Sequence, residues 1–186
     1  MALTPTTKIK LGFTAPVFSL TDVVTNELVT FQDIRGDNGT LVMFICNHCP
    51  YVIHVREQLL ALANDYKNEG FGFVAISSND VANYPQDSPE KMKELALSEN
   101  FPFPYLYDKT QEVARVYNAA CTPDFALFDA EDKCVYRGRL DGATPGNDVP
   151  VTGDSMRKVL DLLLIGEKIN EEGQVPSLGC GIKWIS

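Results

Sequence analysis

The sequence lacks a long apolar run. No window approaches the roughly 18 consecutive apolar residues that a transmembrane helix needs, and the N-terminal MALTPTTKIKLG has no apolar segment typical of a secretion signal. Basic residues are also in the minority, with 16 lysines and arginines against 25 aspartates and glutamates and a net charge of −9. We therefore expect a cytoplasmic protein with neither a membrane nor a nucleic acid as partner.

The cysteine content does not indicate a disulfide framework. The five cysteines are an odd count, and 45% hydrophobic content over 186 residues supplies a core without covalent staples. We expect reduced thiols and one domain spanning residues 1–186. Within it we expect a flexible N-terminal arm over residues 1–12 and a C-terminal tail over residues 170–186.

The chain is organised around residues 41–56, LVMFICNHCPYVIHVR. The five apolar residues 41–45 predict a buried strand, and apolar residues recur at helical spacing after Pro50. Between this strand and helix lies the segment Cys46-Asn47-His48-Cys49. A C-x-x-C motif at a strand-to-helix junction, inside an α/β pattern, is typical of a thioredoxin-like redox site.

The rest of the chain predicts an α/β architecture. The strand at 41–45 and a second at 71–77 flank the helix that follows Pro50, so they should be parallel with a right-handed crossover. The other expected elements are a strand pair at 17–20 and 28–31, an inserted helix at 88–99, a strand at 105–107, a short helix at 110–117, an antiparallel hairpin of 124–128 with 134–140, and a helix at 154–165. This order predicts a thioredoxin-like fold, a central mixed sheet flanked by helices, with an N-terminal β-hairpin, an inserted helix and a C-terminal tail.

Cys49 is the predicted nucleophile. Pro50 favours the first position of a helix, which places Cys49 at the N-cap, where unpaired N–H groups and the helix dipole stabilise a thiolate. Cys46 lies at the strand end without that dipole, and we assign it as the partner thiol. An imidazolium at His48 would lower the pKa of Cys49 further.

A second motif, residues 120–124 (ACTPD), immediately precedes the expected fourth strand. In a thioredoxin fold the loop entering this strand carries a cis-proline beside the redox cysteines. We therefore expect a cis Thr122–Pro123 bond, although only about 5–6% of X–Pro bonds are cis. The Thr122 backbone would then pair with a substrate peptide as a strand. Cys121 would lie near the site, either as a resolving thiol or as a buried apolar filler.

Cys180 stands between two glycines in the C-terminal tail. One interpretation is a mobile thiol that resolves a sulfenic acid or a mixed disulfide; the other is a structural tail with an incidental thiol. Zinc is a rival interpretation of C-x-x-C, but zinc normally takes a second pair, and Cys121, Cys134 and Cys180 form none. We expect no metal and no cofactor.

Several separated motifs resemble those of the peroxiredoxin-like branch of the thioredoxin superfamily, the AhpC/TSA or redoxin-domain proteins. They are residues 47–52 (NHCPYV), 120–124 (ACTPD), 136–138 (YRG), 151–153 (VTG) and 179–184 (GCGIKW), and the resemblance covers Gly12 to Trp184. It implies a thioredoxin-like fold and places Cys49 where peroxiredoxins keep the peroxidatic cysteine.

The chain departs from that family at two positions. Cys46 stands where peroxiredoxins carry a threonine, and Pro123 stands where they carry an arginine. Both family residues position and polarise the peroxide. Arg137 or Arg139 is a candidate replacement for the arginine, but a surface ion pair is the role we expect for either.

Three functions remain open. In a thiol-disulfide oxidoreductase, Cys49 attacks a substrate disulfide, Cys46 resolves the mixed disulfide, and an external thiol reductant restores the pair. In a peroxiredoxin-like thiol peroxidase with an antioxidant role, Cys49 becomes a sulfenic acid that condenses with Cys46, Cys121 or Cys180. The third is a non-catalytic redox-sensing or zinc-holding module. The two departures favour the first, acting on a disulfide-bearing protein or a small thiol or peroxide substrate, with oligomerisation left open.

Overall fold

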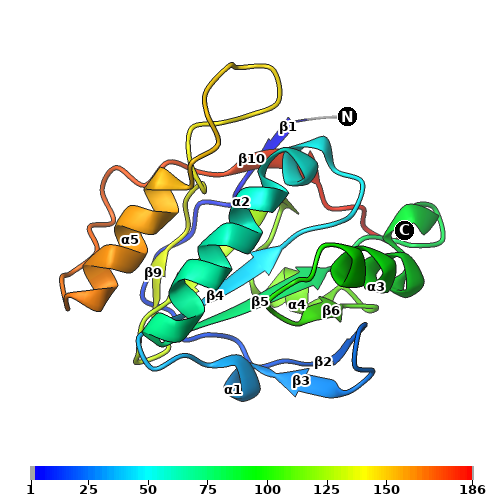
Figure 1. Ribbon diagram of the computed structural model, residues 1–186, viewed down its shortest axis with the longest axis horizontal. Coiled ribbons are helices and arrows are strands. Elements are labelled where there is room, and N and C mark those ends of the chain that lie inside the picture. Colours follow the sequence, from blue (N-terminus) through cyan, green and yellow to red (C-terminus); the bar gives the residue numbers. More distant parts are fainter. Residues whose placement is uncertain (1–2, 186) are drawn as a thin grey trace.

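The computed structural model describes residues 3–185, and a mixed sheet runs through the centre of this part of the chain (Figure 1). The strands of this sheet are β2 (Ser19–Asp22), β3 (Leu28–Thr30), β4 (Gly39–Phe44), β5 (Phe71–Ser77), β6 (Tyr105–Tyr107), β8 (Asp124–Phe128) and β9 (Cys134–Tyr136). They lie in the order β3-β2-β6-β5-β4-β8-β9. Strands β4, β5 and β6 are parallel to one another, and the other neighbours are antiparallel.

Strand β4 occupies the interior of the sheet because both of its faces are apolar. Successive side chains of a strand point to opposite faces. Leu41 and Met43 therefore belong to one hydrophobic cluster, whereas Val42 and Phe44 belong to the other. All four side chains are completely or almost completely buried.

Helices cover both faces of the sheet. Helices α2 (Pro50–Tyr66), α3 (Pro89–Ser98) and α5 (Asp154–Leu164) pack on the face of Leu41, and α1 (Phe31–Ile34) and α4 (Glu112–Val116) pack on the opposite face. Figure 1 shows α2 lying across the sheet with α5 beside it. The described part of the chain also contains two short 3-10 helices, η1 (Lys67–Glu69) and η2 (Pro85–Asp87). The predicted α/β fold, a central mixed sheet flanked by helices, is confirmed.

A second sheet, which the sequence analysis did not predict, joins both ends of the described chain. Strands β1 (Leu3–Pro5), β10 (Leu178–Gly181) and β7 (Cys121–Thr122) form it in the order β1-β10-β7, with antiparallel neighbours. Residues 3–5 of the expected flexible arm are thus paired in a strand, and the buried Thr6 donates a hydrogen bond to Asp124 at 3.1 Å. These short strands have no alternating apolar pattern, which is why pattern analysis missed them.

Other differences from the predicted elements are small. Strand β9 ends at Tyr136 and so is shorter than the predicted 134–140, and its pairing with β8 contains a register shift at Leu127/Phe128. In α5, Met156, Val159 and Leu160 are buried, whereas Leu164 is exposed. Among residues 3–185, no helix combines the length and the apolar character needed to cross a membrane.

Candidate active site

The redox motif lies where β4 ends and α2 begins. Cys49 is the N-cap residue of α2 and Pro50 occupies its first turn, as predicted. The Thr122–Pro123 bond is cis, also as predicted, and brings Thr122 against both cysteines. Its hydroxyl lies 3.4 Å from the Cys46 Sγ, and its carbonyl oxygen lies 3.1 Å from the Cys49 Sγ. All five cysteines lie in the described part of the chain as free thiols.

The surroundings of Cys49 stabilise its thiolate. They lower the pKa of Cys49 to about 4, first through a hydrogen bond from the Cys46 thiol and, against the opposing effect of burial, through the side chains of Cys180 and Thr122. The backbone N–H of Val52 adds to this lowering, although its geometry is not that of a full capping hydrogen bond. Thiol donors therefore supplement the helix N-terminus in holding the negative charge.

The partner thiols are held in the protonated form. The hydrogen bond to Cys49 and burial raise the pKa of Cys46 well above its ordinary value, and the nearby Asp87 carboxylate adds to this rise. Burial and the hydrogen bond to Cys49 likewise raise the pKa of Cys180 to about 12. One thiolate thus accepts hydrogen bonds from two protonated thiols.

Cys180 is not the mobile thiol that one interpretation of the sequence proposed. It lies in the middle of the second sheet with 4% of its surface exposed, and its side chain is against Cys49. Cys121 is a neighbour of the site on β7, where burial raises its pKa and its thiol faces the Pro123 carbonyl at 3.5 Å. Of the two candidates, only Cys180 contributes to stabilising the Cys49 thiolate.

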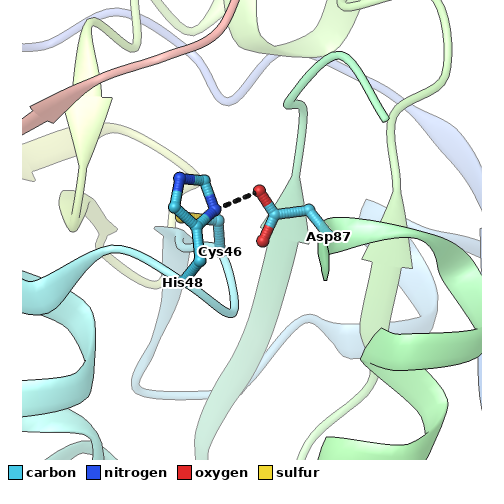
Figure 2. A group of neighbouring side chains, drawn as sticks. All are labelled: Cys46, His48 and Asp87. Atoms are coloured by element: carbon cyan, nitrogen blue, oxygen red, sulfur yellow. Dashed lines mark hydrogen bonds and ion pairs between the residues drawn. The ribbon is translucent and has the colours of Figure 1, made fainter. Parts of the chain in front are cut away.

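His48 contacts the side chains of Asp87 and Tyr84. Figure 2 shows the contact between the His48 ring and the buried Asp87 carboxylate. The His48 Nδ1 lies 2.6 Å from the Asp87 Oδ2, and the ring stacks on Tyr84 with centroids 5.5 Å apart. The lowering of the Cys49 pKa comes from other groups. His48 instead belongs to the environment of Cys46, because ligand atoms of Cys46, His48 and Asp87 lie within 4.8 Å of one another.

Asp87 is the site residue that the sequence analysis missed. This completely buried carboxylate accepts hydrogen bonds from the Asn47 backbone N–H at 2.9 Å and from the Asn79 side chain at 2.8 Å, besides its contact with His48. It comes from the end of η2, about forty residues after the C-x-x-C motif. No local pattern marks such a long-range contact; the one signal was an acid directly before the N-cap Ser88.

The cluster of Cys46, His48 and Asp87 is also where the described residues could hold a metal ion. A structural zinc site takes four ligands, and this cluster supplies three, two of which already bond to each other. The arrangement is therefore better suited to passing a proton between a thiol, an imidazole and a carboxylate than to a closed zinc site.

Arg137 is not in a surface ion pair, contrary to expectation. Its guanidinium is buried, lies 3.3 Å from the completely buried Asp124, and donates to the Tyr117 carbonyl at 2.9 Å. Burial raises the pKa of Asp124, against the opposing effect of Arg137. Because Asp124 also accepts from the Ala120 backbone N–H at 3.0 Å, this ion pair fixes the loop that carries the cis-proline. For Arg139, the described residues show no ion pair at all.

The chain is similar to proteins of a known family. A family model described as Redoxin matches residues 10–155. The chain belongs to the redoxin family. No curated protein matches this redoxin chain, but solved structures do.

An uncharacterised conserved protein from Geobacillus kaustophilus is 54% identical, with a TM-score of 0.97 over 100% of this chain and 97% of that one. A hypothetical protein from Sinorhizobium meliloti 1021 is 42% identical, with a TM-score of 0.95 over 98% of this chain and 99% of the other. The thioredoxin domain of a thiol-disulfide oxidoreductase from Bacteroides vulgatus is 19% identical, with a TM-score of 0.62 over 82% of this redoxin and 99% of that domain, which shows the shared fold. The chain is therefore a thioredoxin-fold protein of the redoxin branch, a family that points to oxidoreductase activity.

The first test concerns the Cys49 thiolate. We expect the ultraviolet absorbance of one thiolate to persist well below neutral pH and to disappear as the pH falls through about 4, because protonation removes the absorbing anion. The measurement is the difference in absorbance between the native chain and Cys49→Ser across a pH titration, with circular dichroism confirming that both stay folded. A transition near the ordinary thiol value, about 8.5, would contradict the assignment.

Proposed function

We propose that this redoxin is a thiol-disulfide oxidoreductase in which Cys49 attacks and Cys46 resolves. The observation that carries the proposal is the pair of opposite pKa shifts in two adjacent thiols. Cys49 is held as a thiolate with a pKa of about 4, whereas the pKa of Cys46 is raised well above its ordinary value. One sulfur is thus ready to attack, and the other keeps its proton until a disulfide forms beside it.

The proposed cycle needs no cofactor. The Cys49 thiolate attacks one sulfur of a substrate disulfide, forming a mixed disulfide and releasing the other substrate sulfur as a thiolate. Cys46 then loses its proton and attacks the Cys49 Sγ, which forms the Cys46–Cys49 disulfide and releases the second substrate thiol. An external thiol reductant returns both cysteines to the reduced state. The substrate is thereby a disulfide-bearing protein or a small disulfide, and the cytoplasmic location stays a prediction.

The second step requires a base for the Cys46 proton. The His48–Asp87 pair is suited to this task, because its atoms lie within 4.8 Å of the Cys46 Sγ and its two partners are joined at 2.6 Å. The Asp87 carboxylate also disfavours a Cys46 thiolate in the resting site. Proton removal is therefore coupled to the moment when Cys46 forms its bond to Cys49.

Peroxidase chemistry is the other redox function of this branch, and two features favour disulfide exchange over it. Cys46 occupies the position of the peroxide-positioning threonine. The guanidinium of Arg137, a candidate for the missing arginine, pairs with Asp124 and donates hydrogen bonds to backbone carbonyls. Neither feature supplies a positive group beside Cys49 to polarise a peroxide.

The mechanism is tested by trapping its intermediate. In Cys46→Ser/Cys180→Ser, the mixed disulfide should form and persist, because both thiols that lie against Cys49 are lost. Non-reducing electrophoresis and mass spectrometry after incubation with a model disulfide-bonded protein would detect the adduct on Cys49. The double variant Cys46→Ser/Cys49→Ser is the control and should trap nothing. Equal trapping by both variants would contradict Cys49 as the nucleophile.

A further inference from the structure

Strand β10 occupies the backbone edge that lies beside the redox pair. In the antiparallel register Cys180 is opposite Thr122 and Gly181 is opposite Cys121, so β10 pairs with the segment that leads directly into the cis-proline. This is the edge at which a substrate peptide would add as an extra strand. In Figure 1, β10 passes next to the first turn of α2, where Cys49 lies.

The pairing is close because it is made by glycine. A Cβ atom on Gly179 would lie 2.0 Å from the Thr122 carbonyl oxygen, so no larger residue fits while β10 is in place. Flanking contacts hold the strand on both sides: the Ser177 hydroxyl donates to the Pro123 carbonyl at 2.8 Å, and the Ile182 backbone N–H donates to the Ala120 carbonyl at 3.0 Å. Pairing of β1 with the other edge of β10 adds to this anchoring.

The docked strand also closes the active site. Cys49 has no exposed surface, and both Cys180 and Cys49 belong to the same buried cluster. Because Cys180 lies against Cys49 and β10 occupies the paired edge of β7, a peptide can pair with Thr122 at this edge only when β10 moves away. A thiol presented by β10 itself needs no such movement.

We propose that β10 is bound to β7 as a substrate peptide would be. In this proposal Cys180 is a third exchange thiol of the site and forms an intramolecular disulfide with Cys49. The proposal rests on the proposed function, because it requires Cys49 to be the sulfur that forms disulfides. An incoming peptide binds by replacing β10 at the same edge. It must be extended, with its cysteine at the position of Cys180 and glycine at the position of Gly179.

The exchange step needs no added oxidant, because one disulfide bond forms as another breaks. Once a substrate joined to Cys49 by its sulfur has left the β7 edge and β10 has paired there again, Cys180 loses its proton to water and its thiolate attacks the Cys49 Sγ. The Cys49–Cys180 bond forms, the bond to the substrate sulfur breaks, and that sulfur leaves as a thiolate that takes up a proton. With Cys46 as the leaving sulfur, the same attack converts the Cys46–Cys49 disulfide into Cys49–Cys180.

The test counts sulfur leaving groups with dithiobis(nitrobenzoate), whose released thionitrobenzoate is coloured. In Cys46→Ser, attack by Cys49 releases the first thionitrobenzoate, and attack by Cys180 releases the second. We expect two releases per chain from this variant and one from Cys46→Ser/Cys180→Ser. The control Cys46→Ser/Cys121→Ser removes the buried cysteine on β7 and should again give two. Peptide mapping should find the Cys49–Cys180 disulfide wherever two releases occur.

The outcomes separate this proposal from the proposed function. One persistent adduct on Cys49 in both Cys46→Ser and its Cys180→Ser derivative would overturn the role of Cys180 and leave Cys49 as the nucleophile. No adduct on Cys49 in either variant would overturn the proposed function itself. A single release from Cys46→Ser/Cys121→Ser would overturn the proposal by assigning the third thiol to Cys121.

A glycine substitution tests the strand separately from the thiol. Gly179→Ala in the Cys46→Ser background should displace β10, which would speed the first release several-fold and slow the second. The matched control is Gly181→Ala, whose new Cβ would lie 3.1 Å from the Thr4 Oγ1 and 3.9 Å from the Ala120 carbonyl oxygen, a much milder contact than at Gly179. Thermal melting would verify that both variants fold. Unchanged rates for both releases in a folded Gly179→Ala variant would show that β10 does not control the site.

Discussion

Cys49→Ser should lose nearly all disulfide-reductase activity, with a fall in kcat/KM of at least about a thousandfold. The reason is the contrast between the two nucleophiles at this position. The Cys49 sulfur is held as a thiolate by the hydrogen bonds of neighbouring thiols and by the helix N-terminus. A serine hydroxyl there stays protonated and cannot form a disulfide with the substrate. The measurement is the rate of reduction of a model disulfide by a dithiol in the presence of each variant.

The control for this loss is Cys134→Ser. Cys134 is buried on β9 within the opposite hydrophobic cluster, and its thiol faces the Tyr136 carbonyl at 3.8 Å, so a serine there can make the same contact. This variant should retain most of its activity. If Cys49→Ser remained active while Cys46→Ser lost activity completely, the order of attack would be reversed, with the first cysteine of the motif as nucleophile.

Asp124→Ala should destabilise the fold by about 3–5 kcal/mol, because it leaves the Arg137 charge buried without its partner. The side chains of the pair have 0% and 4% of their surface exposed. Asp124 also accepts hydrogen bonds from Thr6 and from the Ala120 backbone. Its loss therefore releases the cis-proline loop and the N-terminal strand together. Urea denaturation followed by circular dichroism would measure the change in the free energy of unfolding.

An exposed ion pair provides the comparison for this stability effect. Lys91 and Glu94 on α3 lie 2.6 Å apart, but their side chains are 56% and 64% exposed. Glu94→Ala should therefore change the free energy of unfolding by less than about 1 kcal/mol. A loss of the same small size in Asp124→Ala would mean that Arg137 finds water or another partner, and that the buried pair is not what fixes the loop.

The central elements were predictable because their causes are local. Residues 41–45 are apolar without interruption, and Pro50 marks the first turn of the following helix, so the strand, the turn and the helix follow from short-range chemistry. The position of Cys49 at the N-cap follows from the same proline. The cis Thr122–Pro123 bond was expected from its place before a strand of a recognised fold, and the structure confirms it.

The second sheet was not predictable because its strands are very short and come from distant parts of the chain. Residues 3–5, 121–122 and 178–181 have no alternating pattern, and their pairing depends on a glycine that lets two backbones approach. The expected arm and the expected mobile thiol are therefore both strand residues. The hydrogen bonds that order them come from partners more than fifty residues away along the chain, which no local pattern records.

By itself, the sequence determined the fold class, the C-x-x-C pair and the choice of Cys49 as the sulfur to be ionised. Tertiary structure alone decided what surrounds that sulfur. It placed the buried Asp87 carboxylate beside His48 and Cys46. It also paired the buried guanidinium of Arg137 with Asp124, and it placed the Cys180 side chain against Cys49. The physical reason is the range of the interactions. Helix starts and apolar runs are set by neighbouring residues, whereas the burial and pairing of a charge or a thiol are set by whichever distant segments the fold brings into contact.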